Sequence, residues 1–163
     1  MTAEFLLFLI VASIALGSAI VVILHPNPVY CALALVIALF QVAALFVLLG
    51  AQMIAFLQII VYAGAIMVLF LFVIMLLNLR QETEPASGEW RVAAGVAGSV
   101  LAAELAWFFL SRPMPEAQAP VDGFGSVTSL ARSLFTDHVL SFELTSILLL
   151  VAVVGAVVIA RKG

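Results

Sequence analysis

The sequence predicts an all-α integral membrane protein with five transmembrane helices, and three observations lead to this prediction. Hydrophobic residues make up 66% of the 163-residue chain and charged residues only 9%, whereas about 25% charged residues is usual for a soluble domain. The mean hydropathy is correspondingly high, at +1.34. Several apolar segments reach or exceed the roughly 20 residues that a helix needs to cross a bilayer. We therefore expect residues 1–163 to form a single membrane domain with no sizeable soluble part.

Five apolar segments are expected to span the membrane. They lie at approximately residues 3–24, 29–49, 52–78, 91–110 and 138–160, with two longer loops at 79–90 and 111–137. The first segment lacks the basic leader of a signal peptide, so we expect it to be retained as a span. The turn at residues 25–28 contains two prolines, which cannot continue a helix. Only residues 50–52 separate the second segment from the third, which predicts a tight antiparallel hairpin.

The third segment holds the most informative residues. It carries no charge from about Ala51 to Leu79 and would reach roughly 40 Å as a helix, more than the roughly 30 Å hydrocarbon core of a bilayer. Gln58, Tyr62 and Gly64 fall close together within it, although each is costly or disfavoured on a lipid-facing helix. Gly64 has two interpretations: close packing against another helix, which residue chemistry alone favours, or a slip of the hydrogen-bond ladder into a π-bulge that turns Tyr62. The second interpretation predicts that the third span is interrupted near Tyr62–Gly64.

A few other polar residues are embedded in the predicted spans, namely Gln41, Asn78, Glu104 and Glu143. Polar groups are costly in hydrocarbon and usually face protein or a water-filled cavity, so these residues suit a proton path or contacts between helices. A single glutamine such as Gln41 more often bonds a neighbouring helix. Glu104 lies about two turns from the Arg112 end of its span and is either an interfacial acid that snorkels or a buried functional one.

The second loop is expected to contain a short amphipathic helix at about residues 126–135. Its apolar side would carry Val127, Leu130, Leu134 and Phe135, with Arg132 off that side. The basic residues also predict an orientation for five spans. One side of the membrane would hold Arg80, Arg91, Arg161 and Lys162, and the other side Arg112 and Arg132. The positive-inside rule then places the C-terminus in the cytoplasm and the N-terminus outside.

The sequence contains no nucleophile motif, phosphate loop or metal-ligand cluster, and nothing in it predicts that a flavin or a nicotinamide binds. Cys31 is the only cysteine, which excludes an internal disulfide or a cysteine-based cluster. His25 and His138 are interpreted as interfacial polar residues, in preference to a pair of haem or metal ligands. The net charge of −3 and the lack of a basic run do not suggest a nucleic-acid partner. If the chain belongs to an enzyme, its catalytic centres are expected in other subunits.

The third segment carries a specific motif. The run QIIVYAGAIMVLFLFVIMLLN at residues 58–78 closely resembles the third span of the J-subunit family of the bacterial proton-pumping NADH:quinone oxidoreductase, respiratory complex I. The mitochondrial counterpart is NADH dehydrogenase subunit 6. Residues 27–33 are similar to the start of the family's second span, and residues 134–137 with 142–144 are similar to its entry into the fifth. The resemblance covers essentially the whole chain, in order, with the family's five-span layout.

The resemblance implies a multi-pass, membrane-arm subunit of the bacterial inner membrane that has no redox centre of its own. It implies that flavin mononucleotide and iron–sulfur clusters belong to other subunits. The expected partners are the lipid bilayer and other membrane-arm subunits, including the quinone-site subunit and the small antiporter-like subunits. In this family the third span is described as interconverting between a π-bulged and a regular helix, which is thought to open or close a water path for protons.

The resemblance also implies roles for individual residues. Tyr62 and Gly64 match the positions at the family's bulge. Met67 and Phe70 match positions that gate the water path, and Glu143 matches an acid at the start of the last span. The chain departs from some relatives at Gln58, where they carry a carboxylate. A neutral glutamine relays protons only through water and stores no charge, so a proton-holding role is not expected at this position.

Three other functions remain open on sequence grounds. The nearest alternative is the equivalent subunit of a related complex fed by ferredoxin or another donor, because the electron-input site lies in other chains. The second is a purely structural or assembly subunit, which predicts that Tyr62, Gly64 and Glu143 tolerate replacement. The third, a stand-alone transporter, fits poorly because the chain has no internal repeat and few embedded ionisable groups.

Overall fold

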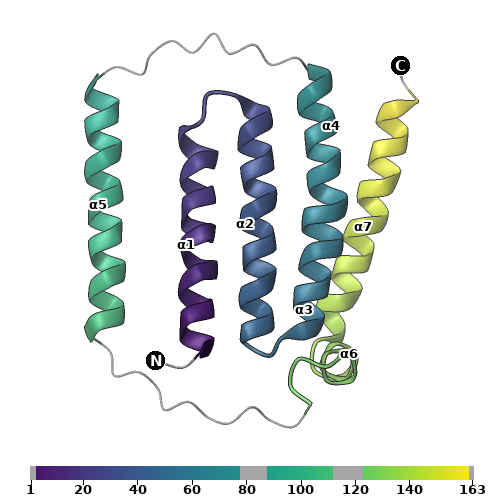
Figure 1. Ribbon diagram of the computed structural model, residues 1–163. Coiled ribbons are helices and arrows are strands. Elements are labelled where there is room, and N and C mark those ends of the chain that lie inside the picture. Colours follow the sequence, from purple (N-terminus) through teal and green to yellow (C-terminus); the bar gives the residue numbers. More distant parts are fainter. Residues whose placement is uncertain (1–2, 78–87, 112–122, 162–163) are drawn as a thin grey trace. The chain divides into compact units, whose positions relative to one another are not determined.

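The computed structural model describes residues 3–77, 88–111 and 123–161, and these residues are helical apart from short turns. The elements, in chain order, are α1 (Ala3–Leu24), α2 (Pro28–Leu48), α3 (Gln52–Leu57), the π-helix η1 (Gln58–Ile66), α4 (Met67–Leu77), α5 (Gly88–Ser111), α6 (Val127–Thr136) and α7 (Val139–Ala160) (Figure 1). The elements α3, η1 and α4 follow one another without a break and form one continuous helix, Gln52–Leu77. The described part of the chain is therefore all-α, as the sequence predicts.

Four helices are long and apolar enough to cross a membrane: α1, α2, Gln52–Leu77 and α7. They correspond to four of the five predicted spans. The fifth predicted span falls on α5, whose helix is present and begins at Gly88 rather than Arg91. Its apolar stretch, Val92–Phe108, is shorter than the other four. Four spans are thus supported directly by length and composition, and a fifth is not.

The chain divides into two compact units, each of which is described by itself. The first comprises Met1–Asn78 together with Pro120–Gly163, and the second is Leu79–Ala119, whose described element is α5. Several residues of the sequence-based predictions lie outside the described ranges. They are Asn78, Arg80, Arg112 and Lys162.

The start of α2 shows why the chain turns sharply after α1. The Asn27 side chain accepts a hydrogen bond from the backbone N–H of Val29 at 2.9 Å and so caps the helix. Pro28 occupies the first helical position, where its missing N–H costs nothing. At the other end of α2, Gly50 adopts a φ of 76°, which a residue without a Cβ reaches freely. These two turns produce the predicted hairpin between α2 and the third helix.

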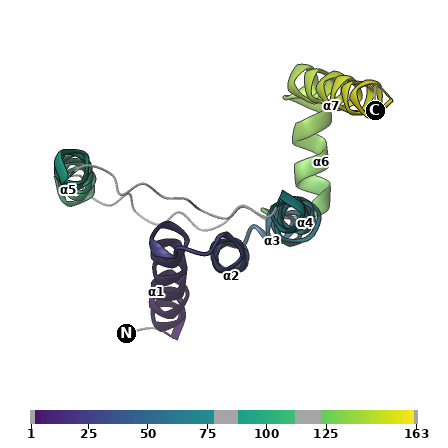
Figure 2. The same ribbon diagram turned by 90° about the horizontal axis from the view of Figure 1, so that it is seen from above.

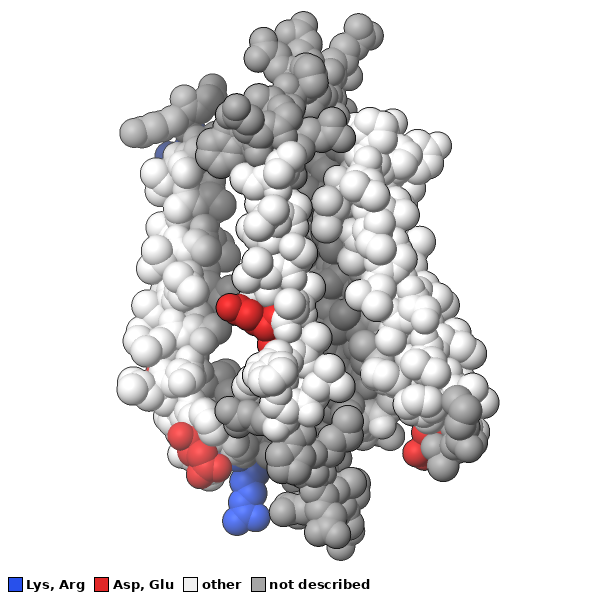
Figure 3. Space-filling model, turned by 90° about the vertical axis from the view of Figure 1, so that its left-hand side faces the viewer, with Lys and Arg blue, Asp and Glu red and all other residues white. Residues whose placement is uncertain are grey.

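The first unit has a small core between α2 and the third helix. Ala32 of α2 packs with Met67 and Ile74 of α4, and apolar residues around them complete the contact. Most other apolar side chains are exposed, and α7 contains no buried residue. In the face drawn in Figure 3, charged side chains are sparse among uncharged ones. Such an extensive exposed apolar surface is typical of helices that lie in lipid or against other membrane subunits.

The short helix α6 confirms the predicted amphipathic segment. Ser126 caps it by accepting a hydrogen bond from the N–H of Ser129 at 3.2 Å. In Figure 1, α6 is seen end-on while α7 stands upright, and Figure 2 shows α6 lengthwise. The two helices therefore lie across each other. Their junction is held by a hydrogen bond from the His138 N–H to the Ser133 carbonyl at 3.0 Å and by an edge-on contact between the rings of Phe135 and Phe142.

Candidate functional site

The candidate site is the π-helical segment in the middle of the third helix. It runs over nine residues, Gln58–Ile66, so its ladder reaches one residue further back than that of an α-helix. The flanking residues Leu57 and Met67 both have right-handed helical dihedrals, with φ of −63° and −71°. The axis therefore passes through the segment without a break. This confirms the predicted π-bulge and shows that it includes Gln58 as well as Tyr62 and Gly64.

Gly64 lies close to the backbone of its own helix. A Cβ placed on Gly64 would meet the carbonyl oxygen of Ile59, five residues earlier, at 3.3 Å. No side chain of another described helix lies within 4 Å of that position. Of the two interpretations of this glycine, the structure of the chain supports the slipped ladder. Close packing against a neighbouring helix, which residue chemistry alone favoured, finds no support among the described residues.

The predicted gate residues differ in their exposure. Met67 is 4% exposed and packs in the core against α2, whereas Phe70, one turn later, is 46% exposed. Tyr62 is 51% exposed and Gln58 is partly buried. Five of the predicted site residues, these four and Gly64, lie along one helix. The structure divides the four between the face packed on α2 and the open face.

The polar side chains of the site have no partners within the described part of the chain. No described residue makes a hydrogen bond with the side chain of Gln58, Tyr62 or Glu143. Glu143 is exposed near the start of α7, and its backbone carbonyl accepts a hydrogen bond from the Ser146 hydroxyl at 2.7 Å. Glu104 is exposed on α5 in the second unit. In a membrane such groups require water or another subunit as a partner.

No cluster for cofactor chemistry forms from the residues that the structure describes. Groups of three or more His, Cys, Asp or Glu side chains that could hold a metal ion do not occur among residues 3–77, 88–111 and 123–161. The Cys31 thiol donates to the His25 carbonyl at 3.1 Å, and the His25 ring lies 4.8 Å from that of Tyr30. These contacts place His25 in the turn before α2, where the sequence predicts an interfacial polar residue.

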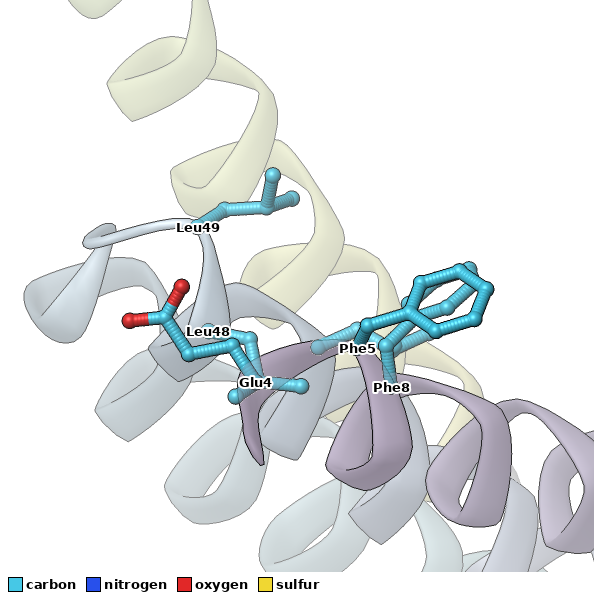
Figure 4. A pocket seen from close by; sticks show the side chains of 6 residues that line it. Glu4, Phe5, Phe8, Leu48 and Leu49 are labelled. Atoms are coloured by element: carbon cyan, nitrogen blue, oxygen red, sulfur yellow. The ribbon is translucent and has the colours of Figure 1, made fainter. Parts of the chain in front are cut away.

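A hollow of about 410 Å³ lies between the start of α1 and the end of α2. Its lining is apolar except for one acid and consists of Glu4, Phe5, Phe8, Leu45, Leu48 and Leu49. Figure 4 shows the Glu4 carboxylate pointing away from the rings of Phe5 and Phe8. A single carboxylate beside aliphatic and phenyl groups supplies neither a nucleophile nor an acid–base pair, so this hollow offers no catalytic chemistry.

Sequence reasoning missed one contact near the candidate site. The carbonyl of Gly125, in the turn before α6, accepts a hydrogen bond from the N–H of Met53 in the first turn of α3, at 3.2 Å. Gly125 has a φ of 72° and lies directly against Gly50. The only signals in the sequence are the glycines themselves, at 50, 123 and 125, and nothing local indicates which of them meet.

Comparisons with known proteins identify the family of the chain. The family model described as NADH-ubiquinone/plastoquinone oxidoreductase chain 6 matches residues 18–159. The chain is 40% identical over 158 residues to NAD(P)H-quinone oxidoreductase chain 6 of Leptolyngbya boryana, covering 95% of this chain and 78% of that protein. It is 36% identical over 157 residues to NADH-quinone oxidoreductase subunit J of Escherichia coli K12, covering 95% of this chain and 85% of that protein. The π-helical third span is thus found in a chain that belongs to the NADH-ubiquinone/plastoquinone oxidoreductase chain 6 family.

Proposed function

We propose that this protein is a membrane-arm subunit of an NADH:quinone oxidoreductase that helps to couple quinone reduction to proton translocation, without carrying a redox centre itself. The observation that carries the proposal is the π-helix Gln58–Ile66 in an apolar helix long enough to span a membrane. A π-helix has poorer hydrogen-bond geometry than an α-helix and occurs often at functional sites. The names of the relatives support the assignment to a quinone oxidoreductase complex.

The proposed mechanism is a change of ladder in the third helix. An i→i+5 hydrogen bond spans one residue more than an i→i+4 hydrogen bond. When the ladder changes from the first to the second, one end of the helix turns about its axis by about 100° relative to the other. Such a turn exchanges the residues that face a neighbouring water path. Tyr62, which is 51% exposed and has no partner in the described chain, is the polar group that enters or leaves that path.

The other site residues have distinct proposed roles. Met67 holds the buried face of α4 against Ala32 and has to leave this contact when α4 turns. Phe70 lies on the open face, where a bulky ring excludes water. Gln58 binds water as a neutral neighbour, because an amide does not store a proton. Glu143 supplies an exposed carboxylate near the start of α7 that other subunits or water complete.

The proposed topology has five spans, with α5 as the fourth. Its 24 residues correspond to about 36 Å, enough to cross the hydrocarbon core. The distribution of Lys and Arg then favours an N-terminus outside and a C-terminus in the cytoplasm, in a bacterial inner membrane. The proposed partners are other membrane-arm subunits, including the quinone-site and small antiporter-like subunits. Flavin mononucleotide and iron–sulfur clusters are assigned to other subunits.

A matched pair of glycine substitutions tests the proposal. In Gly64→Val, the branched side chain would meet the Ile59 carbonyl, so we expect proton pumping and quinone-linked turnover to fall by an order of magnitude or more. The NADH site should still reduce artificial acceptors, because it lies in other subunits. Gly155→Val is the control, since a Cβ there meets no atom within 4 Å beyond the backbone of its own helix within four residues. Undiminished pumping in assembled Gly64→Val complexes would overturn the gate and favour a structural subunit.

The alternative of a related complex with another electron donor is decided separately. It shares the proposed gate, so the glycine pair does not distinguish it. Purification of the complex from its native membrane, followed by an assay of NADH oxidation against oxidation of reduced ferredoxin, identifies the donor. NADH oxidation with quinone as the acceptor supports our proposal.

A further inference from the structure

We propose that Gly125 is a positioning residue for the π-helical gate: its carbonyl caps the first turn of α3, and its missing side chain lets the turn before α6 seat on the α2–α3 hairpin. This inference rests on the proposed function, because the gate is what is positioned. It concerns a contact that lies outside the gate itself. Met53, whose N–H donates to this carbonyl, is the second residue of the continuous helix Gln52–Leu77, which contains Gln58–Ile66.

The close approach of two backbones carries the inference. A Cβ on Gly125 would overlap the carbonyl oxygen of Gly50 and would lie 2.9 Å from the Cα of Ala51. Neither of these atoms belongs to a flexible side chain, so neither can move aside cheaply. Both Gly125 and Gly50 also have positive φ angles, 72° and 76°. Two positive-φ glycines therefore meet where the third helix begins.

The hydrogen bond across this contact satisfies a backbone N–H in the first turn of α3. The first N–H groups of a helix lack partners in the helix and are usually satisfied by a side-chain cap. Ala51, at the cap position of α3, has no side chain that accepts a hydrogen bond. The Gly125 carbonyl takes this role from another part of the chain, through the N–H of Met53. The start of the third helix is thus tied to the turn that leads into α6 and α7.

Apolar side chains also surround this contact. A hollow of about 280 Å³ lies beside the contact, and its lining includes Ile54 of α3 with Phe124 and Leu130 from the α6 side. Phe124 also lies 3.9 Å from the position of a Cβ on Gly50. A rotation of α3 about its axis would break the Met53–Gly125 hydrogen bond. We therefore infer that the start of the helix stays fixed while the segment beyond Leu57 changes its ladder.

The chain provides a control for Gly125 two residues away. Gly123 has a similar φ of 81°, but a Cβ there would meet only the Ser126 hydroxyl at an ordinary 3.8 Å. Gly125→Ala and Gly123→Ala therefore impose comparable backbone strain. Only Gly125→Ala also separates the two backbones. Differences between the two variants report the contact rather than the strain.

The experiment uses the assembled complex and two measurements. Hydrogen exchange of the Gln52–Leu57 amides, read by mass spectrometry, should be about fivefold faster in Gly125→Ala and unchanged in Gly123→Ala, as expected for the loss of one hydrogen bond. The number of protons pumped per electron should fall in Gly125→Ala and stay at the wild-type value in Gly123→Ala. If Gly125→Ala does not assemble, Met53→Pro replaces it. Proline removes the donor N–H and is tolerated in the first helical turn.

The outcomes separate this inference from the proposed function. Unchanged exchange, or equal effects in the two alanine variants, would show that the contact does not hold the helix. Faster exchange with an unchanged pumping ratio would overturn the positioning role. If Gly64→Val abolishes pumping while Gly125→Ala does not alter the ratio, only the positioning role is wrong. If complexes with Gly64→Val pump normally, the proposal of a π-helical gate is wrong, and so is the proposal that Gly125 positions it.

Discussion

The third helix and α7 are two apolar helices of similar length, 26 and 22 residues, yet they use glycine differently. Gly155 lies in a regular α-helix, and a Cβ there would meet nothing within 4 Å beyond the backbone of its own helix within four residues. Gly64 lies in the π-helix, where a Cβ would meet the Ile59 carbonyl at 3.3 Å. The same residue type thus lies in a π-helical ladder in one helix and in an α-helical ladder in the other. The difference comes from the hydrogen-bond ladder, not from hydrophobicity or from a neighbouring helix.

The two helices also differ in how they pack within the chain. Buried residues of the third helix include Ala55, Ala63, Met67 and Ile74, whereas α7 has none. The third helix therefore combines an anchored face with a ladder that can slip. A regular helix that slips by one residue loses every contact on its packed face. A π-helix already contains one residue more than an α-helical ladder needs. It can therefore change to an α-helical ladder while the helix on one side stays in place.

The largest expected effect comes from deleting one residue in each helix. Deletion of Ile60, which is 65% exposed in the π-helix, should convert the ladder to a regular α-helix and keep the flanking faces in register. The complex should assemble but pump no protons. Deletion of Val151, 61% exposed in α7, should turn the rest of that helix by about 100° and prevent assembly. Native gels and proton uptake by vesicles measure the two outcomes. If both deletions prevent assembly, the π-helix does not hold a releasable residue.

A smaller effect is expected from truncating one side chain on each helix. Met67→Ala removes a buried side chain from the core with Ala32 and should destabilise the complex by about 2 kcal/mol, near the low end for core truncations. Leu149→Ala alters an exposed residue of α7 and should change stability by less than about 0.5 kcal/mol. The midpoint of thermal disassembly compares the two. An equal loss in Leu149→Ala would mean that another subunit covers this face of α7.

The sequence predicted the parts of this comparison that depend on local pattern. Uninterrupted apolar runs predicted the helices, and prolines and glycines predicted the turns on both sides of α2. A tyrosine and a glycine within an over-long span left the π-bulge open, and the resemblance to the J-subunit family led us to predict it. The nine-residue length of the π-helix was not predictable, because the choice of carbonyl for each N–H depends on the geometry of the whole turn. The contact between Gly50 and Gly125 was not predictable either, since it joins residues far apart in the chain.

The α5 region shows a different limit of sequence reasoning. The polar segment before it was predicted to be a loop up to residue 90, but the helix already begins at Gly88. Polar residues at the end of a span can continue a helix into the interface, because water satisfies their side chains there. Apolar pattern therefore marks the edge of the hydrocarbon core rather than the end of the helix. The boundary predicted from hydrophobicity is accordingly too short at this end of α5.

The smallest expected effect distinguishes a tyrosine that organises water from one that carries a proton. Tyr62→Phe removes a hydroxyl that has no partner in the described chain, so we expect turnover and pumping to fall together by about fivefold, the equivalent of one hydrogen bond. Tyr30→Phe is the control, because Tyr30 is the other tyrosine of the chain and lies in the first turn of α2 against His25. Quinone-linked NADH oxidation and proton uptake by vesicles measure both variants. Loss of a water contact should slow proton transfer, whereas loss of a proton carrier should stop it. A complete loss of pumping in Tyr62→Phe would therefore contradict a water-organising role.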